Sequence, residues 1–233
     1  MPPPLPQCRQ RPAKPDYNVR MTAPPTITLA FTGASGLPYG LRLLECLLAS
    51  ESQVFLVYSP AAQVVARHET DLTLPAQPHA AAALLAERYR ARPGQLTVFG
   101  REDWMSPIAS GSNTADAMAI CPCTMGTAGA IAAGLADNLI ERAADVMLKE
   151  RRPLVLVPRE TPLSAIHLEN LLKLARAGAV ILPPSPGFYG HPQEIGDLVD
   201  FVVARVLDQL SVAHTLGPRW GEARVAPPAT ERT

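Results

Sequence analysis

Residues 138–160, NLIERAADVMLKERRPLVLVPRE, decide the fold, because they join a helical pattern to an apolar strand. The four apolar residues 154–157 (LVLV) stop at Pro158, which is typical of a parallel strand buried on both faces. Arg159 and Glu160 follow at the carboxyl end of this strand, where open α/β sheets bind ligands. The segment therefore indicates a parallel α/β sheet with a charged site at one edge.

The helical part of this segment allows two interpretations of its charges. Arg142 and Lys149 lie seven residues apart, about two turns, so they project from one face and could hold a phosphate together. Glu141, Asp145 and Lys149 are spaced i, i+4 and i+8, so they could instead form a solvated ladder of ion pairs. The segment alone does not decide between these alternatives.

Composition sets the class of protein. The chain has 233 residues with 47% hydrophobic and 18% charged content, which suits one large α/β domain. Lys and Arg total 21 and Asp and Glu total 21, so no long-range basic field favours nucleic acid or an anionic membrane. No apolar run approaches the roughly 18 residues of a membrane span, and the N-terminus lacks a secretory apolar region. We expect a cytoplasmic protein.

The four cysteines do not form a disulfide pattern, and Cys121-Pro122-Cys123 is not a zinc knuckle. We interpret Cys121 and Cys123 as small hydrophobic residues at a strand end and expect no metal site.

The chain divides into three parts. Residues 1–24 are Pro-rich and lack periodicity, which predicts a disordered extension, and 221–233 form a similar tail around a domain at 25–220. Within the domain, short apolar segments predict strands at 26–32, 53–58, 117–121, 154–157 and 179–182. Helical patterns cover about 38–49, 60–67, 79–91, 125–134, 139–151, 164–177 and 194–211. This alternation predicts a parallel sheet with helices on both faces.

The first turn of the sheet, Gly33-Ala34-Ser35-Gly36, follows a strand and precedes a helix. Its backbone N–H groups and small side chains could cradle a phosphate. It is neither a G-x-G-x-x-G dinucleotide motif nor a nucleoside triphosphate loop, so another phosphorylated cofactor fits better. An ordinary tight turn that uses glycine for its geometry is the alternative.

Hydroxyl and glycine residues also follow the next two predicted strands. Ser59 ends the second strand, and Thr124-Met125-Gly126-Thr127 follows the third. Each hydroxyl alone could be a helix N-cap. Their coincidence at three strand ends favours a ligand site, because hydroxyl and N–H groups at helix N-termini are common donors to phosphate.

Tyr189 and Arg205 carry the remaining signal. Tyr189 lies in the proline-rich stretch 183–190, a stiff loop that could hold an aromatic ring over a pocket. Arg205 lies at the edge of the apolar arc of the last helix, where it could reach water, pair with Asp208 or bind a phosphate.

The segments TGASGLPYGLRLLE (32–45) and residues 121–210, beginning CPCTMGTAGAIAAGLADNLIERAADVMLKERRPLVLVPRE, closely resemble the UbiX-type flavin prenyltransferases. The resemblance covers roughly residues 26–220. It implies a flavodoxin-like, three-layer, doubly wound α/β fold and a homo-oligomer, typically a dodecamer. It also implies transfer of a dimethylallyl group from dimethylallyl monophosphate to N5 and C6 of reduced FMN without a metal. The product, prenylated FMN, would serve UbiD-type decarboxylases, including one of ubiquinone biosynthesis.

The resemblance also assigns residue roles. Residues at the strand ends would contact FMN, namely Gly33, Ala34, Ser35, Ser59, Thr124, Met125, Gly126, Thr127 and Arg159. Residues from elsewhere would bind the prenyl donor, namely Arg142, Lys149, Tyr189, Arg205, Glu69 from another subunit, and Trp220. Glu160 and Ser35 would be catalytic and handle protons near flavin N5 and the leaving phosphate.

Two other functions remain alternatives. An FMN-dependent cysteine decarboxylase shares the fold and uses a catalytic histidine, and His68 is the histidine near the second predicted strand. In that function the basic residues Arg142, Lys149 and Arg205 would have no evident role. A flavin-binding carrier without catalysis is the other alternative.

Overall fold

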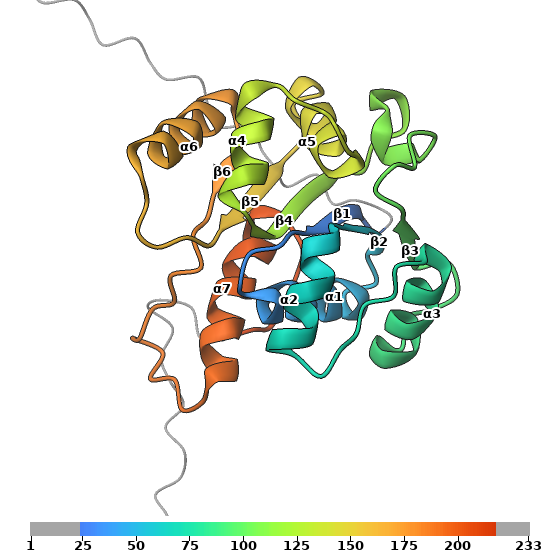
Figure 1. The fold of residues 1–233 in the computed structure, drawn as a ribbon. Coiled ribbons are helices and arrows are strands. Elements are labelled where there is room, and N and C mark those ends of the chain that lie inside the picture. The colour runs from blue at the N-terminus through green and yellow to red at the C-terminus, as the bar shows by residue number, and fades with distance from the viewer. Residues whose placement is uncertain (1–23, 218–233) are drawn as a thin grey trace, which may run out of the picture.

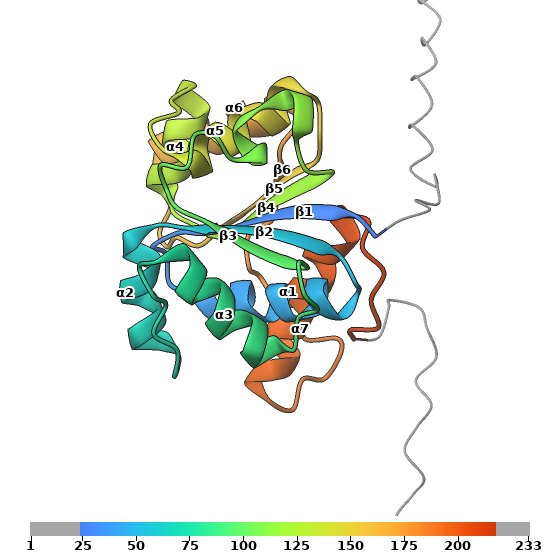
Figure 2. The ribbon, with the colours of Figure 1, turned by 90° about the vertical axis from the view of Figure 1, so that its right-hand side faces the viewer.

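The computed structural model describes residues 24–217, which form one parallel β-sheet between two layers of helices (Figures 1 and 2). The strands are β1 (Thr26–Phe31), β2 (Gln53–Tyr58), β3 (Leu96–Phe99), β4 (Ala117–Cys123), β5 (Leu154–Pro158) and β6 (Val180–Ile181). The helices are α1 (Leu37–Ala49), α2 (Pro60–Glu69), α3 (Pro78–Tyr89), α4 (Met125–Ala133), α5 (Leu139–Lys149), α6 (Ala165–Ala177) and α7 (Ile195–Gln209). Two short 3₁₀ turns, η1 (Pro107–Ala109) and η2 (Gly111–Asn113), precede β4.

The strand order is β3-β2-β1-β4-β5-β6, and every pairing is parallel. The winding direction therefore reverses between β1 and β4. In doubly wound folds, ligands bind in the crevice at the carboxyl ends of the two strands that flank such a switch point. The sequence Gly33–Gly36 follows β1 and the sequence Thr124–Thr127 follows β4, so both predicted phosphate-binding turns lie at this crevice.

The predicted fold class is confirmed, and one element of it was missed. β3 was not predicted, because it has only four residues, lies at the edge of the sheet and is mostly half-buried. The predicted N-terminal extension, apart from Pro24, and the tail at 221–233 lie outside the described residues. Trp220 lies outside them as well.

The two helical layers pack against opposite faces of the sheet. Helices α1, α2, α3 and α7 cover one face, and α4, α5 and α6 cover the other (Figure 2). β4 and β5 are buried on both faces, which explains why their sequences are almost wholly apolar. Among residues 24–217, no helix is both long and apolar enough to cross a bilayer.

A close contact between α1 and the sheet depends on Gly40. A Cβ atom at this position would lie 2.3 Å from the backbone oxygen of Cys121 and 2.9 Å from the Phe31 ring. No side chain fits at that distance, so Gly40 allows α1 to lie directly against β1 and β4. On its other side α1 is joined to α7 by Arg42, whose Nε lies 2.7 Å from Asp200 Oδ1 and whose Nη2 lies 3.1 Å from Asp200 Oδ2.

We expect Gly40→Ala to lower the free energy of unfolding by about 1–3 kcal/mol, because α1 must move away from the sheet. Gly196→Ala in α7 is the matched control, since its Cβ would meet only the flexible Glu194 side chain at 3.4 Å. The control is expected to be neutral or slightly stabilising, as alanine favours helix over glycine. Urea unfolding of both variants measures the difference, and equal stabilities would contradict the packing argument.

Candidate active site

The buried hydroxyl of Thr32 joins the two strand ends at the switch point. Its Oγ1 donates to the backbone oxygen of Pro122 at 2.8 Å and accepts from the backbone N–H of Thr124 at 2.8 Å. Thr32 is 2% exposed, so both bonds are made away from water. The turn after β1 and the turn after β4 are thereby held side by side.

Glu69 binds the N-terminus of α1. Its Oε2 accepts from the backbone N–H groups of Gly36 and Leu37, at 2.8 and 3.0 Å. Gly36 has φ 108°, a left-handed conformation that suits glycine. Two N–H groups of this predicted phosphate-binding turn therefore hold a carboxylate, because the positive end of a helix attracts an anion. The turn therefore binds an anionic oxygen, here supplied by the end of α2.

Arg159 closes the other side of the same turn. Its Nε donates to the backbone oxygen of Ser35 at 3.1 Å, and its backbone N–H donates to the backbone oxygen of Cys123 at 3.3 Å. Ser35 is exposed, and within residues 24–217 no hydrogen bond of its hydroxyl is seen. Glu160, the next residue after Arg159, is also exposed and accepts from the N–H of Thr161. The structure thus brings Ser35, Glu69 and Arg159 together, with Glu160 next in the chain.

Ser59 and Thr124 are both helix N-caps. Ser59 Oγ accepts from Ala62 N at 3.2 Å. Thr124 Oγ1 accepts from Thr127 N at 3.0 Å and donates to Thr127 Oγ1 at 2.9 Å. The N-cap interpretation is confirmed for both. Met125 is buried beneath this turn, whereas Gly126 is exposed. Gly33 packs on the start of α2, since a Cβ there would lie 2.4 Å from that of Ala61.

Burial explains the two cysteines at the switch point. Both Cys121 and Cys123 are fully buried in β4, and burial raises the pKa of the Cys123 thiol to about 12 and also raises the pKa of Cys121. Both thiols are protonated at neutral pH and pack as small apolar groups, as expected. Residues 24–217 contain no group of three or more His, Cys, Asp or Glu side chains arranged to hold a metal.

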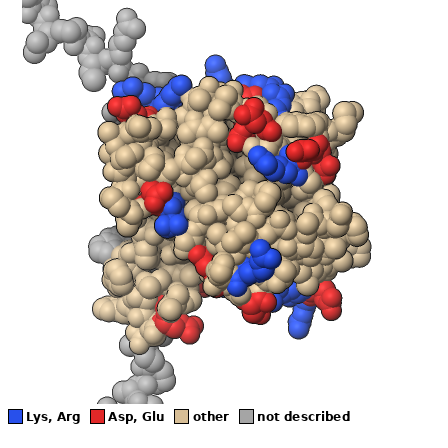
Figure 3. Space-filling view, in the orientation of Figure 1, with Lys and Arg blue, Asp and Glu red and all other residues tan. Residues whose placement is uncertain are grey.

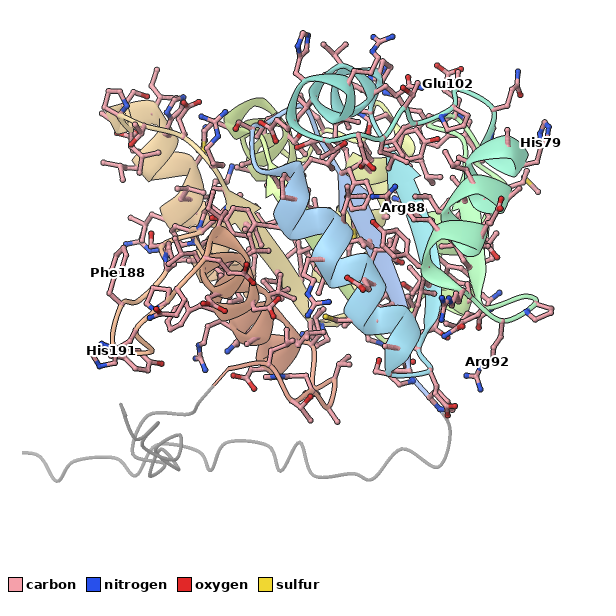
Figure 4. The ribbon with its side chains drawn as sticks, turned by 90° about the horizontal axis from the view of Figure 1, so that it is seen from below. His79, Arg88, Arg92, Glu102, Phe188 and His191 are labelled. Carbon is pink, nitrogen blue, oxygen red and sulfur yellow. The ribbon has the colours of Figure 1, made fainter. Side chains whose placement is uncertain are left out.

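Tyr189 and Arg205 line a separate cavity of about 800 Å³, between α7, the loop before it and residues 214–217. The Tyr189 ring packs edge-on against Phe201 of α7, with ring centroids 5.6 Å apart. Arg205 Nη1 lies 2.7 Å from Asp208 Oδ2, so the predicted pairing with Asp208 is confirmed. Figure 4 shows Phe188 and His191 on the loop beside α7.

Arg142 and Lys149 lie on α5. The alternative ladder of Glu141, Asp145 and Lys149 does not form, because Asp145 pairs with Arg142 and Lys149 pairs with Glu150. Arg142 donates through Nε to Ala109 O and pairs through Nη1 with Asp145 Oδ2, each at 2.9 Å. Lys149 pairs with Glu150, whose carboxyl pKa is lowered by this contact. Arg142 and Lys149 are not joined by a shared anionic side chain in the described residues.

The candidate donor-binding residues therefore lie on both faces of the sheet. Arg142 and Lys149 belong to the α4–α5–α6 layer, and Tyr189 and Arg205 belong to the layer that contains α7. The sheet separates these two pairs within one chain. Neither pair belongs to the cluster of Ser35, Glu69 and Arg159, and these three residues do not line the cavity beside α7.

The sequence did not indicate His214 as a site residue. It follows the end of α7 and contacts Asp208, six residues earlier, because the chain turns back after the helix. No periodic pattern or motif predicts such a contact.

The charge on the face shown in Figure 3 does not mark a binding site, because basic and acidic side chains are interspersed there.

Comparison with known proteins identifies the family. Residues 17–207 match the Flavoprotein family. The flavin prenyltransferase UbiX of Pseudomonas aeruginosa is 60% identical over 202 residues, which cover 87% of this chain and 97% of the relative.

Two solved structures are similar along nearly the whole described chain. AnUbiX (PadA1), solved in complex with FMN and dimethylallyl pyrophosphate, has a TM-score of 0.76 and 42% identity, covering 86% of this chain and 100% of its own. The dodecameric FMN-dependent UbiX-like decarboxylase of Escherichia coli O157:H7 has a TM-score of 0.75 and 42% identity, covering 84% and 100%.

More distant proteins share only the fold. The FMN-dependent cysteine decarboxylase TvaF is 17% identical with a TM-score of 0.51, which supports no common activity. The identity to UbiX proteins is far higher and spans nearly their full length. The chain therefore belongs to the Flavoprotein family and, within it, to the flavin prenyltransferases of the UbiX type.

Proposed function

We propose that this chain transfers a dimethylallyl group from dimethylallyl monophosphate to N5 and C6 of reduced FMN, which releases phosphate and forms prenylated FMN. The observation that carries the proposal is the convergence of Ser35, Glu69 and Arg159 at the β1–β4 switch point. A UbiD-type decarboxylase, such as one in ubiquinone biosynthesis, is the proposed recipient of the product. The cytoplasmic location remains a prediction.

The residues at the switch point fit FMN. The turn after β1 already binds an anionic oxygen, and Ser35, Ser59 and Thr127 add hydroxyl groups to the Arg159 cation. A cation combined with hydroxyl and N–H donors matches the chemistry of a phosphate ester. Gly126 is exposed, and a Cβ there would meet only Thr124 Oγ1 at 3.9 Å, so a ligand can approach the backbone at this turn. Gly33 and Ala34 would contact FMN from the more enclosed turn after β1, and Met125 packs beneath the turn after β4.

The donor site is proposed to form between copies of the chain. Arg142 and Lys149 lie on one face of the sheet and Tyr189 and Arg205 on the other, so one chain cannot direct all four at one phosphate. Closed symmetric oligomers bring different faces of identical chains together. The dodecameric relative supports such an assembly, in which Glu69 and Trp220 would also act near a neighbouring copy.

The proposed chemistry gives these residues distinct tasks. Reduced FMN supplies the nucleophilic positions N5 and C6. When the allylic C–O bond breaks, negative charge grows on the leaving phosphate, and Arg142, Lys149 and Arg205 stabilise it together with the Tyr189 hydroxyl. Closure of the ring onto C6 needs a proton on the double bond of the N5-attached group, which makes that group electrophilic, and then loss of the proton from C6. Glu160 would act as the acid that supplies the first proton and as the base that takes the second, and Ser35 would relay protons near N5. A monophosphate bound by side chains needs no metal, whereas the AnUbiX complex was solved with the pyrophosphate.

The direct test of the proposal is anaerobic incubation with reduced FMN and dimethylallyl monophosphate, without added metal, followed by mass analysis of the released flavin. A flavin heavier by one five-carbon prenyl unit supports the proposal. Unmodified, tightly bound flavin would favour a carrier, and decarboxylation of a peptidyl cysteine would favour the cysteine decarboxylase alternative.

Glu160→Gln is expected to bind FMN normally but to form prenylated FMN about 10²-fold more slowly or worse, because the amide cannot accept a proton. Glu87→Gln, which changes an exposed carboxylate on α3, is the control and should retain full activity. Anaerobic product formation followed by mass analysis measures both rates. Normal turnover by Glu160→Gln would remove this residue from the mechanism.

Arg142→Ala and Arg205→Ala are each expected to abolish turnover when every copy carries the change. Oligomers can be reassembled from equal amounts of both variants. If a site takes Arg142 and Arg205 from different copies, each of the two arginines is intact in about half of the sites, so roughly a quarter of the sites have both and about a quarter of full activity should return. A site within one chain would recover none. The same assay on the reassembled mixture decides between these outcomes.

A further inference from the structure

Arg205 belongs to a continuous chain of hydrogen bonds that ends in the backbone after α7. Its Nη1 lies 2.7 Å from Asp208 Oδ2, and Asp208 Oδ1 lies 3.2 Å from His214 Nε2. His214 Nδ1 in turn accepts from the backbone N–H of Leu216 at 3.2 Å. Asp208 thus uses one oxygen for each neighbour and connects Arg205 to the segment that follows the helix.

The backbone after α7 places His214 for this contact. α7 ends at Gln209, and Ser211 has φ 57°, which reverses the direction of the chain. Val212 then donates to Leu207 at 3.0 Å and is buried, so the reversed segment packs back against the helix. The His214 side chain is only 8% exposed as a result, whereas the Arg205 side chain is 54% exposed.

The contacts of His214 assign a different role to each ring nitrogen. Nδ1 accepts a hydrogen bond from the Leu216 N–H, which leaves Nε2 as the nitrogen that faces Asp208 as a donor. Asp208 accepts this bond on one oxygen, so its other oxygen is directed at Arg205. His214 and Arg205 therefore fix the orientation of the Asp208 carboxylate, in addition to any neutralisation of charge.

We propose that Asp208 and His214 are positioning residues that hold Arg205 ready for the phosphate of the prenyl donor. This inference rests on the function proposed above, in which Arg205 binds that phosphate. A long, half-exposed arginine loses rotational entropy when it binds a ligand. Asp208 removes part of that loss in advance, because it restrains the guanidinium group before the donor arrives.

The surrounding cavity supports a role in binding. Tyr189 and Arg205 line it together with Asp208 and His214. The hydrogen-bonded series Arg205–Asp208–His214, called the relay below, therefore borders the same space as the two proposed phosphate ligands. Phe201 lies one turn before Arg205 on α7 and packs against the Tyr189 ring. Tyr189 is thus positioned by packing, and Arg205 is positioned by the charged relay.

Asp208→Asn tests the proposal through donor affinity. Calorimetry of the variant loaded with oxidised FMN, which cannot turn over, should show dimethylallyl monophosphate binding about tenfold more weakly, because a charge-assisted hydrogen bond is lost. FMN affinity and elution of the oligomer should be unchanged. Glu45→Gln is the matched control, as Glu45 forms the same i,i+3 pair with Arg42 on α1 at 2.8 Å but does not line the cavity.

Two substitutions of His214 separate positioning from simple stability. His214→Asn can still accept from the Leu216 N–H but cannot reach Asp208, whereas His214→Gln can still donate to Asp208 but holds the Leu216 turn less well. We expect His214→Asn to weaken donor binding about threefold to fivefold and His214→Gln less than about twofold. If His214 only stabilised the Leu216 turn, His214→Gln would weaken donor binding as much as His214→Asn or more.

The results distinguish the relay from the function on which it rests. If the unchanged protein does not bind dimethylallyl monophosphate, the proposed function fails. If it binds but Asp208→Asn binds equally well, or Glu45→Gln loses as much affinity, the relay alone is wrong. Weaker binding in Asp208→Asn that accompanies an altered oligomer would also overturn it, because the effect would then be structural.

Discussion

The two hydrogen bonds of the buried Thr32 hydroxyl hold the site together, because they join the ends of β1 and β4 where the winding of the sheet reverses. The turn that starts α1 and the turn that starts α4 depend on this link for their spacing. Glu69, Ser35 and Arg159 then gather around the first turn. A buried hydroxyl that both donates and accepts is well suited to this task, since it satisfies two backbone groups without adding a charge.

The same sheet that creates the crevice also divides the cationic residues. Arg142 and Lys149 are held on one face by Asp145, Ala109 and Glu150, whereas Arg205 is held on the other face by Asp208. Each cation thus has a partner on its own face before any ligand binds. Such partners would reduce repulsion among the cations in the proposed assembly of copies. Each cation also keeps N–H donors that its partner does not use, and these can bind a phosphate dianion.

The sequence was sufficient for the parallel sheet, because strands such as β4 and β5 are short and apolar. The strand order that creates the switch point was not predicted, because it depends on pairing between distant segments. The sequence was also insufficient for β3, since four residues at a sheet edge, three of them half-buried, carry little pattern. The N-caps Ser59 and Thr124 were predictable from local rules. Contacts between distant segments, such as Glu69 with Gly36 or His214 with Asp208, depend on tertiary packing and leave no spacing signal.

The end of the sheet at β6 limits how copies of the chain can associate. β6 has only two residues, and Pro183 and Pro184 follow it almost at once, so this edge offers few N–H groups. An added strand from another chain needs a long row of free donors and acceptors. Continuous sheets across copies are therefore disfavoured at this edge, and association there must rely on the shapes of helices and loops, which discriminate between partners far better than a repeating backbone does.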